Sequence, residues 1–166
     1  MSLTAQQVTA PQVEELICAS DRIFDSASFE TELSTALAGL TSPGDIRAAA
    51  VKVLRDRQKS GRASIAQAFA ERPFDARPMT RAYTFLTDQP VTAALRVARD
   101  RLHPKPNPTA SEHLAVIAVG GYGRGEMAPF SDVDLLFLPP YTITAWAESV
   151  VESMRYILWD LKHNVV

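Results

Sequence analysis

The sequence AVIAVGGYGRGEMAPFSDVDLLFL, residues 115–138, contains the pattern that decides the fold of this chain. Its first apolar run has strand character and ends in a turn with four glycines, Gly120, Gly121, Gly123 and Gly125. Asp132 and Asp134 then lead directly into a second apolar run, residues 135–138. A carboxylate is costly to bury unless a cation or a hydrogen-bond donor accompanies it. The two acids therefore predict a functional site.

Composition and charge restrict the class of protein. At 166 residues the chain has the length of one ordinary domain, and 46% apolar and 22% charged residues are typical of a soluble globular protein. The formal charge of -2 argues against a nucleic-acid binder. No apolar run approaches the ~20 residues that cross a membrane, which argues against a membrane partner. The single cysteine, Cys18, excludes an internal disulfide and favours a reducing, cytoplasmic location.

The chain before the glycine turn has the apolar spacing of helices. This spacing predicts helices over about 11–21, 29–40, 43–72 and 83–102. Gly61 costs about 1 kcal/mol inside the third of these, so a break there stays open. The fourth is expected to be interrupted near Pro90, because proline removes a helical hydrogen bond.

The alternating prolines of residues 103–108 mark the clearest linker. We divide the chain there into an N-terminal helical region, residues 1–108, and a second region, residues 109–166, with the order strand, glycine turn, strand, helix. Thr142 is expected to cap the last helix, whose apolar stripe starts at Ile143 and packs across a sheet. The predicted fold class is α+β, predominantly helical, with a small sheet packed by a long helix.

Three common motifs do not fit residues 115–138. A P-loop requires lysine and then serine or threonine after its glycines, whereas glycine and glutamate follow Arg124 here. A Rossmann fingerprint requires a full helix and an acid about 20 residues later, whereas Pro129 ends the helix early and the acids come too soon. A calcium loop continues with polar residues and a glycine, whereas Asp134 precedes an apolar run.

Metal-assisted nucleotidyl transfer fits the two acids best. Asp132 and Asp134 are two apart in a strand, so their side chains share one face and their Cα atoms lie about 6.6 Å apart. Carboxylates at this spacing can hold one or two Mg2+ ions, which stabilise the attacking and leaving oxygens of phosphoryl transfer. The alternative is a pair of ordinary surface acids. The unbroken apolar run 135–138 argues against it, because such a run predicts burial on both faces of the strand.

The glycine turn provides a place for phosphate groups. Because glycine lets backbone amides approach a triphosphate closely, Gly120 and Gly121 are candidate nucleotide-binding residues. Arg124 is a candidate phosphate ligand as well. A salt bridge from Arg124 to Glu126 or Asp132 is the alternative.

These residues resemble a known signature. Val119-Gly120-Gly121, ten intervening residues and Asp132-Val133-Asp134 resemble the signature of the DNA polymerase beta-like nucleotidyltransferase superfamily. The longer string GGYGRGEMAPFSDVDLLFL is similar to that of the bacterial PII uridylyltransferase/uridylyl-removing enzymes. The flanking strings PNPTASEHLAV and TAWAESVVESMRYILWDLK are similar to the same family, so the resemblance extends over about residues 45–166.

The resemblance implies roles for individual residues. Asp132 and Asp134 would be catalytic, holding Mg2+ and positioning UTP, while Gly120 and Gly121 would contact its phosphates. Ser131 would contact the triphosphate or, alternatively, cap the second strand. The implied reaction transfers UMP to a tyrosine of the PII signal protein and releases pyrophosphate. Removal of UMP and control by glutamine would belong to domains outside this chain.

The resemblance also implies a missing part. The superfamily uses a third carboxylate on a later strand, so we expect this chain to be the first part of a nucleotidyltransferase domain and to be inactive alone. Two other functions stay open. One is the adenylyltransferase that modifies glutamine synthetase, although the GKLGGRE-like turn usual in that family is absent. The other is a non-catalytic module that binds nucleotides or regulates assembly.

Overall fold

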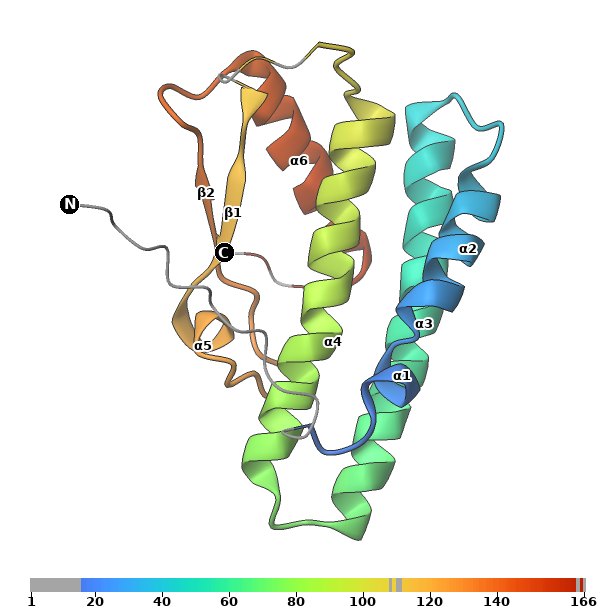
Figure 1. Ribbon diagram of the computed structural model, residues 1–166, viewed down its shortest axis with the longest axis vertical. Helices are drawn as coiled ribbons and strands as arrows, with labels where there is room; N and C mark the ends of the chain where they lie inside the picture. Colours follow the sequence, from blue (N-terminus) through green and yellow to red (C-terminus); the bar gives the residue numbers. More distant parts are fainter. Residues whose placement is uncertain (1–15, 108, 110–111, 164, 166) are drawn as a thin grey trace, which may run out of the picture.

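The computed structural model describes residues 16–107, 109, 112–163 and 165. In chain order its elements are α1 (Ser20–Ile23), α2 (Ser26–Leu37), α3 (Pro43–Glu71), α4 (Ala76–Val97), the π-helical turn η2 (Ala98–Leu102), β1 (Ala115–Ala118), α5 (Gly120–Gly123), β2 (Leu135–Leu138) and α6 (Ala145–Asp160). Figure 1 shows the sheet and α5 on one side of α4, and α2 and α3 on the other. The predicted α+β class with mainly helical content is confirmed.

Helix α3 is continuous through Gly61, so no break occurs there. It begins with Pro43 at its first position, where proline costs no hydrogen bond. Gly61 is needed for packing: a Cβ on it would lie 2.5 Å from the carbonyl oxygen of Ile23 and 2.7 Å from Leu86 Cδ1. Its missing side chain lets α1 and α4 approach α3 closely.

Helix α4 also continues where the sequence predicted an interruption. Pro90 lies inside it and is buried, so the expected break near this residue is wrong. Packing along both sides of the 22-residue helix outweighs the local cost of about 3 kcal/mol. The predicted helix at 11–21 lies mostly outside the described residues. Its described part is not helical before Ser20, where α1 begins.

The two strands form an antiparallel pair in which Ala115 faces Leu138 and Ala118 faces Leu135. Beside them, Val133 and Val165 form an isolated parallel bridge. The expectation that β2 is buried on both faces is wrong. Leu136 and Leu138 are 45% and 44% exposed, whereas Leu135 is 9% exposed. The helices cover only the face that carries Leu135.

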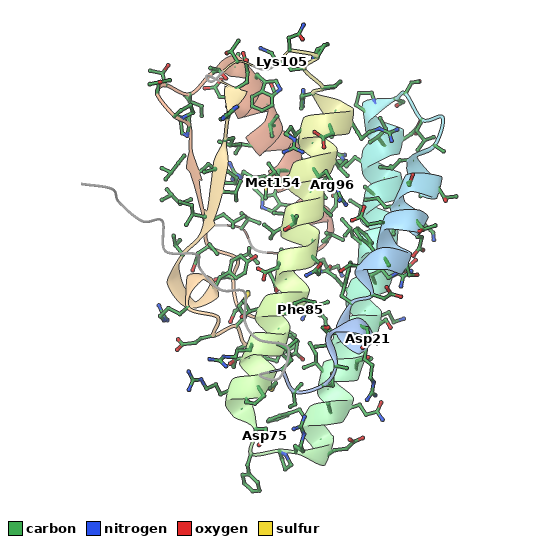
Figure 2. The ribbon with its side chains drawn as sticks, viewed as in Figure 1. Asp21, Asp75, Phe85, Arg96, Lys105 and Met154 are labelled. Atoms are coloured by element: carbon green, nitrogen blue, oxygen red, sulfur yellow. The ribbon has the colours of Figure 1, made fainter. Side chains whose placement is uncertain are left out.

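Helix α6 begins two residues later than predicted. Thr144, not Thr142, is its N-cap, because the Thr144 hydroxyl accepts a hydrogen bond from the Ala147 amide at 3.2 Å. Ile143 therefore precedes the helix and is 53% exposed, outside the apolar stripe. Most of the remaining stripe is buried, while Trp146 and Val151 are half-buried. Met154, labelled in Figure 2, is fully buried near α4.

Helices α3 and α4 share one apolar core with α6 and the strands. Polar contacts join the same parts: Arg55 donates to the carbonyl of Asp160 at 2.8 Å, and the buried Gln58 and His163 side chains lie 2.5 Å apart. Burial is the main cause that lowers the pKa of His163 to about 4, and the charge of Arg62 lowers it further. The division near residue 108 stays a prediction. Among the described helices, no segment has the length and hydropathy needed to span a bilayer.

Candidate active site

The glycine turn folds as the single helical turn α5, directly after β1. Gly120 has a φ of 61°, which disfavours any residue with a side chain. A Cβ on Gly120 would also lie 2.5 Å from the Asp134 Oδ2 atom. The carboxylate of Asp134 therefore lies against the backbone of the turn. The positive φ favours glycine at this position, and a side chain there would also have to displace the Asp134 carboxylate.

Asp132 and Asp134 lie on the open side of the sheet. The Val119 amide donates to the carbonyl of Asp134 at 3.1 Å, which extends the β1–β2 ladder by one step. Side chains alternate along a strand, so the fully buried Val133 points into the core and the two acids point away from it. Asp132 is exposed and Asp134 is half-buried next to Gly120. The predicted common face of the two acids is thus present.

The two carboxylates fit a cation. Within the described part of the chain, neither the Asp132 nor the Asp134 side chain forms a hydrogen bond or an ion pair. Carboxylate oxygens that have no other partner are the ligands Mg2+ prefers. In the same part of the chain, no group of three acid, histidine or cysteine side chains could hold a metal ion. The described residues thus provide two ligands, completed by water, phosphate or other groups.

Arg124 forms the salt bridge that the sequence left as an alternative. Its Nε atom lies 2.9 Å from Glu126 Oε2, and both side chains are largely exposed. An exposed pair of this kind contributes about 0–1 kcal/mol, so a phosphate can compete for the guanidinium. Binding of phosphate by Arg124 stays a prediction.

Ser131 holds the loop that leads into the second strand. Its hydroxyl oxygen accepts a hydrogen bond from the Ala128 amide at 2.9 Å, and its own amide donates to the Ala128 carbonyl at 3.2 Å. The hydroxyl hydrogen is not used in these bonds and can still donate to a phosphate oxygen. The structure therefore gives Ser131 a local role, and its contact with a triphosphate stays a prediction.

Helix α4 holds the glycine turn through a partly buried contact that the sequence did not reveal. The Tyr122 hydroxyl donates to Asp88 Oδ1 at 2.7 Å. Burial raises the pKa of the Asp88 carboxyl, while the hydrogen bond from Tyr122 lowers it. Burial, and then the Asp88 charge, raise the pKa of Tyr122. The only signal in the sequence is an acid in an apolar helical pattern, which names no partner.

Two further contacts fix the loop between the turn and the acids. The Arg62 Nη1 atom donates to the Pro129 carbonyl at 2.6 Å, and the Met127 amide donates to the Thr84 hydroxyl at 3.4 Å. Arg62 belongs to α3 and Thr84 to α4, so both helices position this loop. These helices are the ones to which the sequence assigned no chemistry.

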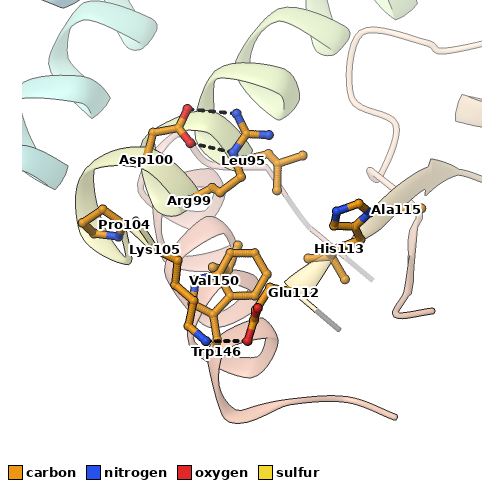
Figure 3. Close-up of a pocket in the computed structure, with 11 residues that line it drawn as sticks. Leu95, Arg99, Asp100, Pro104, Lys105, Glu112, His113, Ala115, Trp146 and Val150 are labelled. Atoms are coloured by element: carbon orange, nitrogen blue, oxygen red, sulfur yellow. Dashed lines mark hydrogen bonds and ion pairs between the residues drawn. The ribbon is translucent and has the colours of Figure 1, made fainter. Parts of the chain in front are cut away.

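A cavity of about 770 Å³ lies at the other end of β1, around Ala115 (Figure 3). Its charged side chains neutralise one another: Arg99 pairs with Asp100, and Lys105 pairs with Glu112. The bonds from Lys105, followed by those from Thr109, lower the pKa of Glu112 to about 2. Because these charges are already paired and the cavity is at the opposite end of β1 from the glycine turn, we do not assign it to the candidate active site.

Comparison with known proteins places the chain among nucleotidyltransferases. The family model described as glutamate-ammonia ligase adenylyltransferase (GlnE) matches residues 3–158. The chain belongs to this family. Within it, the curated relatives confirm the resemblance to the uridylyltransferase/uridylyl-removing enzymes. Three proteins with the name bifunctional uridylyltransferase/uridylyl-removing enzyme are similar to the chain, from Ruegeria pomeroyi, Cereibacter sphaeroides and Erythrobacter litoralis.

The matched family members are much longer than this chain. The Ruegeria pomeroyi protein is 59% identical over 86% of the chain and 16% of its own length. The Cereibacter sphaeroides protein is 49% identical over 93% of the chain and 17% of its own length. The Erythrobacter litoralis protein is 45% identical over 72% of the chain and 13% of its own length. The chain thus spans about one sixth of these relatives. No solved structure matches it.

Proposed function

We propose that the protein carrying this chain is a Mg2+-dependent nucleotidyltransferase that transfers UMP from UTP to a tyrosine hydroxyl of the PII signal protein. The observation that carries the proposal is the close approach of the Asp134 carboxylate to the backbone of Gly120. It brings a place for a cation beside a place for phosphates, as metal-assisted transfer requires. The names of the relatives support UMP as the transferred group.

The residues on the open face of the sheet have distinct tasks in this proposal. Asp132 and Asp134 would hold the Mg2+, which when bound supplies positive charge that stabilises the leaving diphosphate. The first amides of a helical turn have no acceptor within it, so those of Gly120 and Gly121 can donate to phosphate oxygens. Ser131 can donate its hydroxyl hydrogen to the same group.

The reaction itself is a substitution at phosphorus. The acceptor oxygen forms a bond to the α-phosphorus of UTP, and the bond from that phosphorus to the bridging oxygen of the β-phosphate breaks. Pyrophosphate leaves, and the proton of the acceptor hydroxyl passes to a base or to water. The two aspartates and the glycine turn orient the triphosphate, so that the acceptor attacks opposite the leaving group.

Calorimetry on the 166-residue chain tests nucleotide binding. UTP should bind in a Mg2+-dependent manner and more tightly than ATP. Asp132→Asn and Asp134→Asn should each weaken UTP binding in the presence of Mg2+ by at least tenfold, because each variant loses a metal ligand. Asp56→Asn removes an exposed acid of α3 and should change nothing. Equal Mg2+-dependent binding by the wild type and both site variants would contradict the proposal.

Transfer is tested in a longer protein that carries this chain. Incorporation of labelled UMP into PII should be lost in the Asp134→Asn variant, and also when the acceptor tyrosine of PII is replaced by phenylalanine. Uridylylation that persists in the Asp134→Asn variant, or in PII that lacks the acceptor tyrosine, would overturn the assignment. Removal of UMP, control by glutamine and a cytoplasmic location remain proposals for the whole protein.

Adenylyl transfer to glutamine synthetase is a second candidate, favoured by the name of the family model. It predicts that ATP binds more tightly than UTP and that labelled AMP is incorporated into glutamine synthetase. A non-catalytic module instead predicts nucleotide binding that is independent of Mg2+ and unaffected by Asp132→Asn. The same calorimetric series therefore separates all three functions.

A further inference from the structure

A polar contact lies in the core between α3 and the residues that follow α6. The side chains of Gln58 and His163 are 6% and 7% exposed, and their Nε2 atoms lie 2.5 Å apart. The nitrogen of an amide group only donates, so the His163 Nε2 atom accepts and the neutral imidazole carries its proton on Nδ1. Buried polar groups that satisfy each other fix the relative position of the elements that carry them. Neither residue has a part in the function proposed above.

The end of α6 directs His163 towards α3. The His163 amide donates to the Leu158 carbonyl at 3.0 Å. The Lys162 amide donates to the Trp159 carbonyl at 2.8 Å, which completes the bond pattern of a Schellman motif. Glycine usually occupies the position of Lys162, because its φ of 62° costs a residue with a side chain about 1–2 kcal/mol. A strained turn of this kind persists only where the surrounding structure determines the path of the chain.

Two residues after His163, the chain lies beside the candidate active site. Val165 forms a parallel bridge with Val133. Val133 is fully buried and lies between Asp132 and Asp134 in the chain. Because side chains alternate along a strand, the seat of Val133 in the core determines where the two carboxylates point. A shift of Val165 therefore moves the backbone from which both acids project.

Arg62 supplies a second anchor from the same side of α3. It lies four residues after Gln58, so the two side chains are neighbours on the surface of the helix. Its Nη1 atom donates to the Pro129 carbonyl at 2.6 Å, a short distance along the chain before Val133. Its charge also lowers the pKa of His163, because the guanidinium lies near the imidazole. Helix α3 thus holds the chain before Val133 through Arg62 and the chain beside Val133 through Gln58.

We propose that Gln58 is a positioning residue for the two acids of the candidate active site. Through His163 it fixes Val165, whose bridge holds the backbone between the acids in the geometry that a cation needs. The ligands of a catalytic cation must be held within about 0.5 Å of their working positions. Since Gln58 is buried in the core, it acts only through this backbone. The part that concerns the cation rests on the function proposed above, whereas the effect on the backbone does not.

Two variants separate positioning from stability. Gln58→Leu leaves the buried His163 acceptor without its donor and should lower the free energy of unfolding. The double variant Gln58→Leu/His163→Leu should regain most of that stability, because both polar groups of the pair are replaced by apolar ones. Neither variant retains the hydrogen bond, so both should lose the fixed position of Val165. Gln67→Leu removes an exposed amide group from the same helix and is the matched control.

Hydrogen exchange in the 166-residue chain measures the backbone without any nucleotide. The Val119 amide donates to the Asp134 carbonyl, so its protection reports the position of Asp134. In both Gln58 variants this amide should exchange about tenfold faster, while the amides of α2 keep their rates in the double variant. Gln67→Leu should change neither. Unchanged protection of Val119 in the double variant overturns the inference, and this result does not depend on UTP binding.

A longer protein that carries this chain tests the effect on catalysis. The kcat for UMP transfer should fall about tenfold or more in Gln58→Leu and in the double variant, because the acids are misplaced. The KM for the acceptor protein should stay unchanged. A double variant that regains both its stability and its kcat would show that Gln58 only stabilises the fold, which overturns the inference. A wild type that transfers no UMP contradicts the proposed function, and the exchange rate of Val119 then decides the role of Gln58.

Discussion

The helical scaffold and the segment 119–134 between the two strands are stabilised in different ways. The scaffold, α1–α4 with α6, buries apolar side chains at helical spacing along its length. The segment buries only Tyr122, Met127 and Val133. Its other contacts are single hydrogen bonds to α3 and α4, such as those of Tyr122 and of the Pro129 carbonyl. The candidate active site therefore has little core of its own and takes its shape from the helices beside it.

The largest effect is expected at Gly120, where the segment 119–134 makes its closest contact, with the Asp134 carboxylate. Gly120→Ala should reduce the free energy of unfolding by about 3 kcal/mol, because the left-handed backbone disfavours a Cβ and the Asp134 carboxylate must turn aside to make room for it. Gly125→Ala is the matched control. Its φ is 72°, but no atom lies within 4 Å of the new Cβ, so about 1 kcal/mol is expected. Urea unfolding measures both; equal losses would show that the contact with Asp134 is unimportant.

The next effect concerns His163, whose buried side chain lies against Gln58 of α3. Burial lowers the pKa of His163 from 6.5 to about 4, so between these pH values the unfolded chain binds a proton that the folded chain does not. Stability should therefore rise by about 3 kcal/mol from pH 4 to pH 6.5. His163→Gln should remove most of this rise, and His113→Gln, at an exposed position, should retain it. An unchanged pH profile for His163→Gln would contradict the assignment.

A smaller effect is expected where the segment joins α4. Tyr122→Phe removes the hydrogen bond to the half-buried Asp88 and should cost about 2 kcal/mol at pH 7. The cost should shrink as the pH falls through the raised pKa of Asp88, because the protonated carboxyl needs this donor less. Tyr156→Phe removes an exposed bond to Glu152 and should have little effect. Urea unfolding at pH 7 and at pH 4 separates these cases; a loss that is independent of pH would count against the charged bond.

The smallest effect tests the two faces of β2. Leu136→Ala, on the open face, should cost less than about 1 kcal/mol in the 166-residue chain, since its side chain is already 45% exposed. Leu135→Ala, on the covered face, should cost about 2–3 kcal/mol because it leaves a cavity. Thermal unfolding of the two variants is the measurement. Similar losses would mean that both faces are covered in solution.

The sequence predicted those features of the site that depend on residues close together in the chain. The spacing of Asp132 and Asp134 predicted a shared face because strand side chains alternate, and the structure contains that face. It also offered Glu126 as a partner of Arg124, which is the pair observed. It could not predict that Gly120 touches Asp134, since that contact depends on how α5 folds back against the second strand.

The errors in the fold have a common cause. The expected break at Pro90, the cap at Thr142 and the two-sided burial of residues 135–138 were each inferred from a few neighbouring residues. In the structure, packing along the whole of α4 keeps Pro90 within the helix. The N-cap of α6 is Thr144, because its hydroxyl accepts a hydrogen bond from the Ala147 amide. Local preferences of about 1–3 kcal/mol do not decide an element that many tertiary contacts stabilise.

The sequence by itself determined the fold class, the strand–turn–strand order and the pair of acids, because these follow from apolar periodicity and from the spacing of a few residues. Only the tertiary structure decided that Asp88 holds the turn and that Arg62 of α3 holds the loop that follows it. Tyr122 is 34 residues away from Asp88 along the chain, and Pro129 is 67 residues away from Arg62. Contacts over such separations have no period in the sequence and exist only once α3 and α4 pack against this segment.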